Sequence, residues 1–501
     1  MAYAWNWVQH GQVEHIKRDL QSRHINMIAI TGMIGTGLFL SSGQVISIAG
    51  PAGAFLAYLV MGLVTAGVAY TTGEITAFMP STGGFIRHAT KFVEPALGAA
   101  TGWNIWYTMS ITAPAEVIAA ATLVQYWRVD VSIAVWITVF ALFILVINFC
   151  NIRLYGESEV IFSSLKIMLI VGLIIGGIVI NAGGGPEGEY IGFRYWTTPG
   201  AFNTYIASGD TGRLLAFWKV LLMAAFSYGK IQVVAISGSE TRNPRTVIPR
   251  ATKKTFVRVF LFYVLSVFII GLIVPSNDPG PSLETGTVSQ SPFVLAFTRM
   301  GVDVLPHVIN AVVCTSAISS SSGCDDHAPR IFQRCNRFGT PVYAVGLSVI
   351  LLPLGYLTLG DEASTVFSWF VNITTATYLR FYQGLKVQGF SRDGLPYRNF
   401  MQPYAAWGTL SMVVIVLLFS GFDVFTKGNF TASGLLTSYL NIGIFAILYI
   451  FFKITLKSKL VPLSVIDFQS EFDAIEQENA SGEYLVRTGR LSWWKRVLRW
   501  F

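Results

Sequence analysis

Twelve apolar stretches alternate with shorter polar connections along the chain. Each stretch is close to the length that a helix needs to cross about 30 Å of hydrocarbon. They cover residues 25–45, 52–78, 99–124, 131–150, 157–180, 214–238, 255–275, 302–320, 342–359, 364–385, 405–422 and 435–453. The pattern predicts an all-α polytopic membrane protein with about twelve transmembrane helices. The membrane domain would cover residues 25–453, between polar tails at 1–24 and 454–501.

Basic residues gather in every second connection and in the two tails. If the N-terminus is cytoplasmic, the inner connections hold Arg87, Lys91, Arg153, Arg242, Arg245, Arg250, Lys253, Lys254, Arg330, Arg334, Arg337, Lys386, Arg392 and Arg398. The outer connections hold only scattered cations. Because short cytoplasmic loops carry an excess of Lys and Arg, we expect both termini to lie in the cytoplasm.

Composition agrees with a membrane protein. The chain has 501 residues, of which 53% are hydrophobic and 12% charged, whereas soluble proteins carry about 25% charged residues. The net charge of +8 follows from the loop pattern, so we expect no nucleic-acid partner. The four cysteines show no metal-ligand spacing, and the chain shows no catalytic His, Cys or Asp cluster at membrane depth. We therefore expect no metal site, no cofactor and no enzymatic activity.

The first apolar segment is interrupted by glycine. Gly32, Gly35 and Gly37 lie in its middle, and each internal glycine costs a helix roughly 1 kcal/mol relative to alanine. Unwound backbone persists at membrane depth only where protein or a polar cavity satisfies its N–H and C=O groups. The interruption predicts a place where the backbone meets a ligand. Close packing of helices through small residues is an equal alternative.

A second interruption, Ser227 to Lys230, lies near the centre of the sixth segment, five helices after the first. Paired interruptions in two halves are typical of inverted-repeat transporters, whose substrate site lies at the membrane midplane. The N-terminal end of a half-helix favours an anion, and its C-terminal end favours a cation. An α-amino acid carries both charges, so two facing interruptions suit it.

Several motifs support this interpretation in chain order. They are Arg23–Phe39, containing ITGMIGTGLF, then Gly50–Gly53, Gly73–Ile75, Pro80–Gly84, Pro114–Glu116, Glu240–Arg245 (ETRNPR) and Tyr378–Lys386. Through them the chain resembles the fungal amino acid permeases of the amino acid–polyamine–organocation superfamily, from about residue 15 to 475. The resemblance implies a LeuT-like fold of five plus five inverted helices with discontinuous helices 1 and 6, and two further helices. It also implies uptake of amino acids across the plasma membrane.

The resemblance implies substrate-binding residues at both interruptions. The backbone of Gly35, Thr36 and Gly37 would receive the substrate carboxylate. The ammonium would meet carbonyls near both interruptions. The expected substrate-binding set is Met33, Gly35, Thr36, Gly37, Phe226, Ser227, Tyr228, Lys230 and Gln232. Relatives usually carry a glutamate where this chain has Gln232 and a small or uncharged residue at Lys230, so an inward-pointing Lys230 would favour acidic or neutral substrates.

Two ionisable residues lie deep in predicted helices. A lysine at the membrane centre, such as Lys166, costs about 2.5–3.5 kcal/mol on insertion scales and tends to be functional. Because burial disfavours its charged form, Lys166 would release and rebind the coupling proton, as the resemblance also implies. The alternative is a lysine that extends to the inner surface. Glu116 would accept a proton, neutralise a buried cation or serve a structural role.

Further charges gather at the inner ends of helices. Two interpretations apply to Arg87, Glu240, Arg242 and Arg245, an inner-gate ion network or simple topology charges, and we favour the second. We place Glu74 at the inner interface or gate. The serine-rich end of the eighth segment and the tenth segment each look about a dozen residues short of the family pattern, which is about 18 Å of helix.

These features predict a permease that imports amino acids by proton symport with alternating access. An amino-acid exchanger is one alternative, and a non-transporting amino-acid sensor is another. The expected partners are the amino acid substrate, protons and the lipid bilayer.

Overall fold

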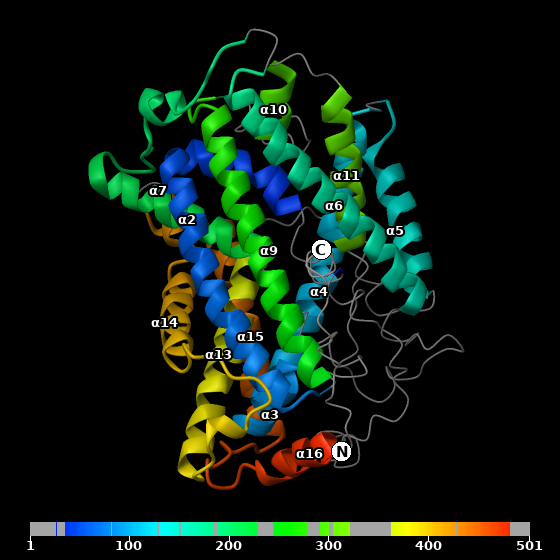
Figure 1. The fold of residues 1–501 in the computed structure, drawn as a ribbon, viewed down its shortest axis with the longest axis vertical. Helices are drawn as coiled ribbons and strands as arrows, with labels where there is room; N and C mark the ends of the chain where they lie inside the picture. The colour runs from blue at the N-terminus through cyan, green and yellow to red at the C-terminus, as the bar shows by residue number, and fades with distance from the viewer. Residues whose placement is uncertain are drawn as a thin grey trace.

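The computed structural model describes Met27 and residues 36–81, 83–127, 130–149, 152–184, 188–228, 244–278, 291–299, 304–320, 362–426 and 429–480. Within these ranges every regular element is a helix (Figure 1). The all-α prediction is confirmed. Described helices fall within eleven of the twelve predicted segments, and the remaining segment, 342–359, lies outside the described residues.

The described part of the first predicted segment, from Thr36, joins the second segment in one element with a corner. Helix α2 covers Thr36–Phe78, but Gly50 interrupts it with φ 74° and ψ 169°, and Pro51 begins the second part. A Cβ at Gly50 would lie 2.7 Å from the carbonyl oxygen of Ala201. Glycine is therefore required twice, for its positive φ and for the close approach of the 188–208 loop. The corner falls between the two predicted segments.

The other helices follow the predicted segments closely. They are α3 (Phe85–Phe92), α4 (Pro95–Gln125), α5 (Ile133–Phe149), α6 (Ile152–Asn181), η2 (Trp196–Gly200), α7 (Gly209–Ser227), α9 (Pro244–Ile273), α10 (Pro292–Arg299), α11 (Val304–Ser320), α13 (Glu362–Val387), η8 (Arg392–Gly394), α14 (Tyr404–Leu418), η9 (Phe422–Phe425), α15 (Ala432–Thr455) and α16 (Gln469–Ala480).

Four described helices are long and apolar enough to cross a membrane: Ser42–Phe78, Glu157–Asn181, Val247–Ile273 and Ser438–Thr455. Three shorter apolar helices, Ile133–Ile144, Val304–Thr315 and Tyr404–Leu418, also lie in predicted segments. The eighth segment, which looked short in the sequence, has 17 helical residues up to the last residue described, and the tenth has 26.

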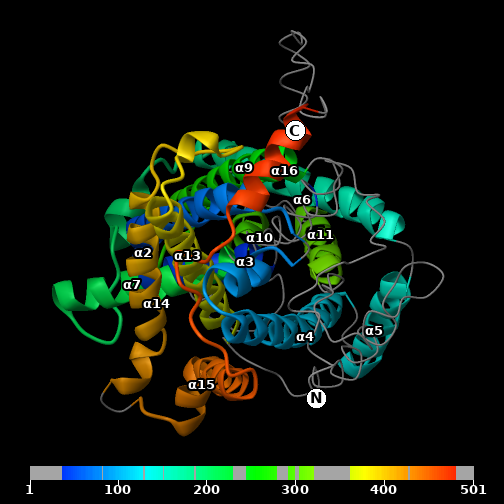
Figure 2. The same cartoon turned by 90° about the horizontal axis from the view of Figure 1, so that it is seen from below.

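Two groups of helices pack around a shared apolar core. Helix α2 packs against α7, α9, α13 and α14, while α4 packs against α3, α5, α11 and α15. Helix α6 contacts both α9 and α11 and so joins the groups. Seen along the helices in Figure 2, α5, α14 and α15 lie at the periphery and α3 lies near the centre.

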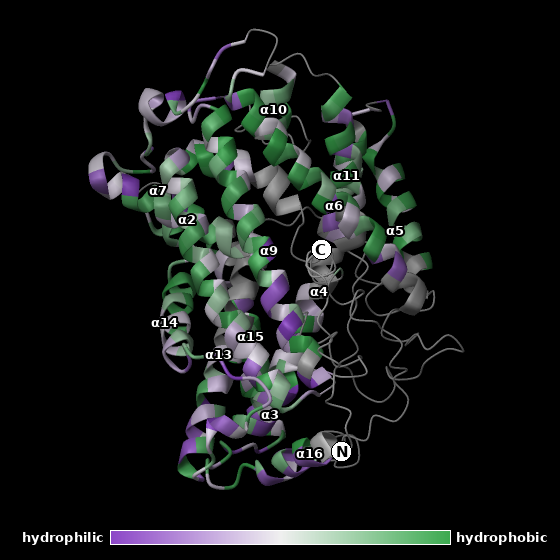
Figure 3. Ribbon diagram, viewed as in Figure 1, coloured by the Kyte–Doolittle hydropathy of each residue, from purple (hydrophilic) through white to green (hydrophobic). Residues whose placement is uncertain are grey.

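Polar side chains gather at one end of the bundle, which we call the basic end. It consists of α3, the C-terminal end of α13, the 388–403 linker and α16, and it lies at the bottom of Figure 3 below mostly apolar helices. It carries Arg87, Lys91, Lys386, Arg392 and Arg398. These residues belong to the predicted inner connections, so the structure gathers them on one side of the molecule.

The predicted C-terminal tail begins as a packed segment. Residues 459–480, which we call the C-terminal strap, cross the basic end and place Phe468 fully buried among the rings of Phe78, Phe92 and Phe381. The backbone N–H of Val461 donates to the carbonyl of Val93 at 2.9 Å. The strap therefore covers the ends of α2, α3 and α13 as an integral part of the fold.

Glu471 attaches the strap through charge. Its carboxylate lies 3.1 Å from the Lys91 ammonium and 3.7 Å from the Arg245 guanidinium. We expect Glu471→Gln to loosen the strap by about 1 kcal/mol, since the pairs are only partly exposed to solvent. Limited proteolysis of the purified protein should then cleave residues 459–480 several times faster. Glu476→Gln, an exposed change on the same helix, is the control, and equal cleavage rates in both variants would contradict the expectation.

Candidate functional site

Helix α7 ends inside the protein, at the predicted interruption of the sixth segment. Its last residue is Ser227, and Tyr228 follows in a turn. Both residues are buried, with 5% and 0% of their surface exposed. The last carbonyls of a helix have no partner within the helix. A helix that ends in an apolar core therefore needs hydrogen-bond donors from neighbouring elements.

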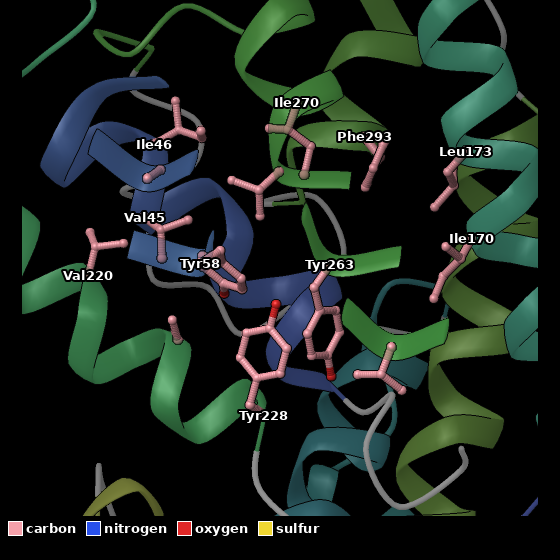
Figure 4. Close-up of a cluster of buried hydrophobic side chains, with 14 of the residues drawn as sticks. Val45, Ile46, Tyr58, Ile170, Leu173, Val220, Tyr228, Tyr263, Ile270 and Phe293 are labelled. Carbon is pink, nitrogen blue, oxygen red and sulfur yellow. The ribbon is translucent and has the colours of Figure 1, made fainter. Parts of the chain in front are cut away.

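Two tyrosines supply these donors. The Tyr263 hydroxyl of α9 donates to the backbone carbonyl of Ser227 at 2.8 Å. The Tyr58 hydroxyl of α2 lies 3.1 Å from the Ser227 hydroxyl, which also reaches the carbonyl of Met223 at 3.3 Å. Figure 4 shows the rings of Tyr58, Tyr228 and Tyr263 grouped around this end of α7. Two neighbouring helices, α2 and α9, thus fix the position of the α7 end.

The hydroxyl of Tyr228 is buried without a hydrogen-bond partner in the described part of the chain. Its ring packs against Tyr263 with centroids 4.9 Å apart. A Cβ at Gly62 of α2 would lie 2.9 Å from this hydroxyl and 2.4 Å from the Phe260 ring. Glycine at position 62 thus lets α2 approach α9 and the Tyr228 hydroxyl closely. A buried, unpaired hydroxyl at a helix end is a polar group available to a ligand.

The two capping tyrosines should differ in importance. Tyr263→Phe leaves the buried Ser227 carbonyl without its donor, which costs roughly 1–3 kcal/mol. Tyr58→Phe leaves Ser227 with its Met223 bond and should cost less. We expect Tyr263→Phe to lower the melting temperature and raise KM for uptake more than Tyr58→Phe does. The measurement is a paired thermal melt and uptake titration, and an equal or reversed order would contradict this account.

Lys166 lies on the buried face of α6, with 0% of its surface exposed. It is the fifteenth residue of a 30-residue helix, so the side chain is deep in the helix and does not extend to the surface. One turn earlier, the Ser163 hydroxyl donates to the carbonyl of Met27 at 2.7 Å. This bond places the start of the first apolar segment beside the polar part of α6.

Comparison with known proteins adds the decisive observation. A family model described as "Amino acid permease" matches residues 24–464. The chain belongs to this family. It is a transporter family, so the expectation that the chain is not an enzyme is confirmed, as is the resemblance to fungal amino acid permeases.

Individual relatives match along almost the whole permease. A proline-specific permease of Emericella nidulans is 36% identical over 97% of this chain and 94% of its own length. A lysine-specific permease of Saccharomyces cerevisiae is 35% identical over 93% and 80%, and a dicarboxylic amino acid permease of that yeast is 33% identical over 92% and 82%. The alignment with the first spans 523 positions, so that relative carries residues with no counterpart here.

Glu116 and Arg87 of the permease lie in described helices. Glu116 belongs to α4, two residues after Pro114 inside that helix, and is 8% exposed. Arg87 lies half-buried in the short helix α3. The neighbouring residue, His88, is fully buried. Burial lowers the pKa of its imidazole and outweighs the bond to the Met79 carbonyl, which raises it, so the pKa is about 4. The imidazole is therefore neutral at physiological pH, and its Nε2–H donates to Met79.

Glu74 has a more specific place than the sequence indicated. Its side chain is fully buried at the end of α2 and accepts bonds from Arg392 Nε at 3.0 Å, Arg392 Nη2 at 2.8 Å and the Tyr378 hydroxyl at 2.8 Å. The backbone N–H of Asn399 adds a further bond at 3.2 Å. The cluster ties α2 to α13 and to the 388–403 linker. Arg392 therefore belongs to a buried ion pair as well as to the topology charges.

Arg245 closes the end of α2 in a similar way. Its guanidinium donates to the carbonyl of Phe78, the last residue of α2. Only 6% of this residue is exposed. Arg380, which belongs to the tenth predicted segment, donates to the carbonyl of Phe92 at 2.9 Å and so lies at the basic end.

The remaining expected site residues lie at or beyond the edges of the described ranges. Thr36 and Gly37 are in the first turn of α2, and Phe226 is in the last turn of α7. Met33, Gly35, Lys230, Gln232, Glu240 and Arg242 lie outside the described residues. Sequence reasoning missed Tyr58 and Tyr263, which carry no charge or spacing that distinguishes them from core aromatics.

Proposed function

We propose that this permease imports amino acids across the plasma membrane by proton symport with alternating access. The observation that carries the proposal is the buried end of α7 at Ser227, beside the unpaired Tyr228 hydroxyl. The C-terminal end of a helix carries a partial negative charge that favours a cation, such as the substrate ammonium. Gly35, Thr36 and Gly37 would supply backbone N–H groups to the carboxylate, and Met33, Phe226, Lys230 and Gln232 would complete the pocket.

Lys166 is the proposed proton carrier. Its side chain is fully buried at the middle of α6, and ionisable residues inside membrane segments mark ion and proton pathways. Glu116 is the second candidate for this role. Coupling matters because one positive charge moving inward gains about 2.3 kcal/mol per 100 mV, enough for roughly fifty-fold accumulation. Arg87, Glu240 and Arg242 would form the inner gate, with both termini in the cytoplasm.

The proposed substrate class rests on two residues of the second interruption that differ from the family pattern. Lys230 and Gln232 replace an uncharged residue and a carboxylate in the family pattern, which would disfavour lysine- or arginine-like substrates. The names of the relatives cover proline, lysine and dicarboxylic amino acids at similar identities. We therefore propose a neutral or acidic amino acid as substrate.

The test is uptake of a labelled amino-acid panel by cells that lack their own permeases, with and without a proton uncoupler. We expect accumulation of neutral or acidic amino acids that collapses with the uncoupler. Uptake that requires internal amino acid and ignores the uncoupler would show an exchanger. Binding without flux, from protein shown to be at the cell surface, would favour the sensor.

A further inference from the structure

Arg258 is an unexpected charge inside α9. It is the fifteenth residue of a 30-residue helix, in a stretch predicted to cross the membrane. Only 7% of its surface is exposed. Ionisable side chains in such positions are rare and mark pathways or binding sites for charged groups. The function described above assigns no role to Arg258.

The guanidinium has no counter-charge in the described part of the chain. No hydrogen bond or ion pair to it is found there, and its Nε is buried without an acceptor. A buried charge is ordinarily paired, because leaving one uncompensated costs about 3–5 kcal/mol. An anion that joins Arg258 in another state of the transport cycle would remove this cost.

The contact between α6 and α9 shows where Arg258 points. Gly177 of α6 faces Ile269 of α9, since a Cβ at Gly177 would lie 2.3 Å from Ile269 Cγ2. Eleven residues earlier in each helix come Lys166 and Arg258. Eleven residues are about three turns, so each lies on the same face of its helix as the contact residue. Both cations therefore line the sides by which α6 and α9 face each other.

Arg258 lies on the inner side of the α7 end. Helix α9 begins at the basic end, where Arg245 binds the end of α2, and continues past Arg258 to Tyr263, which caps Ser227. Five residues separate Arg258 from Tyr263, a rise of about 7.5 Å. A ligand that moves from the interruption toward the basic end would therefore reach Arg258 next.

We propose that Arg258 forms a second, transient carboxylate site, which the substrate occupies between the interruption and the basic end. This inference rests on the proposed amino acid import and adds an inner binding step to it. The planar guanidinium binds a carboxylate through two parallel hydrogen bonds. Lys166, the proposed proton carrier, lies on the facing side of α6 at the same depth and adds positive charge when it is protonated. The site is left unpaired so that the carboxylate can arrive and leave.

The test uses purified protein reconstituted into liposomes, with a labelled amino acid from the uptake panel. The variants are Arg258→Met, Arg258→Lys and the exposed control Lys253→Met on the same helix. We expect Arg258→Met to raise the half-saturating internal substrate concentration about tenfold or more, the loss of one charged hydrogen-bonded contact. The external KM should stay within about threefold of wild type, since the outer site is unchanged. The internal half-saturation of Arg258→Lys should be intermediate, because lysine keeps the charge but lacks the planar guanidinium that forms two parallel hydrogen bonds.

A thermal melt separates this role from a structural one. Removing an uncompensated buried charge should raise the melting temperature of Arg258→Met, whereas a structural arginine would lose stability. An unchanged internal half-saturation in Arg258→Met, or a lowered melting temperature, would overturn the inference.

Two other anions are separated in the same assay. Replacing internal chloride with gluconate would reproduce the Arg258→Met effect if the bound anion were inorganic. Glu159 is a buried carboxylate seven residues before Lys166 on α6, and Glu159→Gln would reproduce the effect if the anion were the protein's own carboxylate. Either result would overturn the inference. A wild-type protein that transports without proton dependence would instead reject the coupling mechanism and leave the Arg258 comparison valid.

Discussion

Glu74→Gln is expected to destabilise the permease by about 3 kcal/mol, the lower part of the range for breaking a buried ion pair. The carboxylate is fully buried, while the Arg392 side chain is 20% exposed and keeps some access to water. Glutamine preserves the shape and one acceptor oxygen but removes the charge that Arg392 pairs with. A thermal melt of the purified protein in detergent measures the change.

The same linker offers a matched control for this prediction. Arg398 pairs with Asp393, and both side chains are largely exposed, at 54% and 76%. Exposed pairs contribute little to stability, so Arg398→Gln should melt close to wild type. If Glu74→Gln and Arg398→Gln had the same melting temperature, the buried Glu74 cluster would contribute no more to stability than an exposed ion pair.

Glu74 also shows what position along the chain cannot reveal. The sequence placed it at the inner end of a helix, because it follows a long apolar run. Its partners come from residues 378–399, more than 300 positions away, and a single sequence carries no signal for such pairings. Local pattern therefore predicted the depth of the residue, while tertiary packing determined its role.

The helices themselves were predictable because each must bury its backbone polar groups within its own segment. The boundaries of α4, α5, α6 and α15 differ from the predicted ones by a few residues. The prediction of a polar tail from residue 454 gave no sign of this packing, in which Phe468 and Ile466 are buried under the basic end. The apolar residues of this stretch are interspersed with polar ones, and their packing partners on α2, α3 and α13 lie far away along the chain.

Arg258 is the reverse case, a residue that the sequence could have indicated. It lies inside the apolar segment 255–275, and the rule that identified Lys166 applies equally to it. It lies three residues from the start of that segment and close to the inner-connection cations Lys253 and Lys254. Burial of the side chain, which depends on α6 and α9 packing together, is what distinguishes it from its exposed neighbour Lys253.

Lys166→Met should abolish concentrative uptake while leaving slow equilibration of substrate across the membrane. With no group to carry the proton, the variant should transport at the same rate at an external pH of 5 and 7, whereas wild type should be faster at pH 5. The substituted residue is fully buried, and methionine fills a similar volume without a charge to desolvate, so folding should be retained. Uptake at the two pH values, with a surface-expression assay, measures both effects.

Lys219 provides the control for Lys166. It also lies in a predicted membrane segment, but its ammonium is 2.5 Å from the Asp423 carboxylate and both side chains are about a quarter exposed, at 24% and 21%. The Asp423 carboxylate compensates the Lys219 charge within this ion pair, so Lys219→Met should retain the pH dependence of wild type. If Lys166→Met also retained it, the coupling proton would be carried elsewhere, and Glu116 would be the next residue to replace. The comparison thus tests whether full burial, rather than membrane depth alone, makes a lysine a proton carrier.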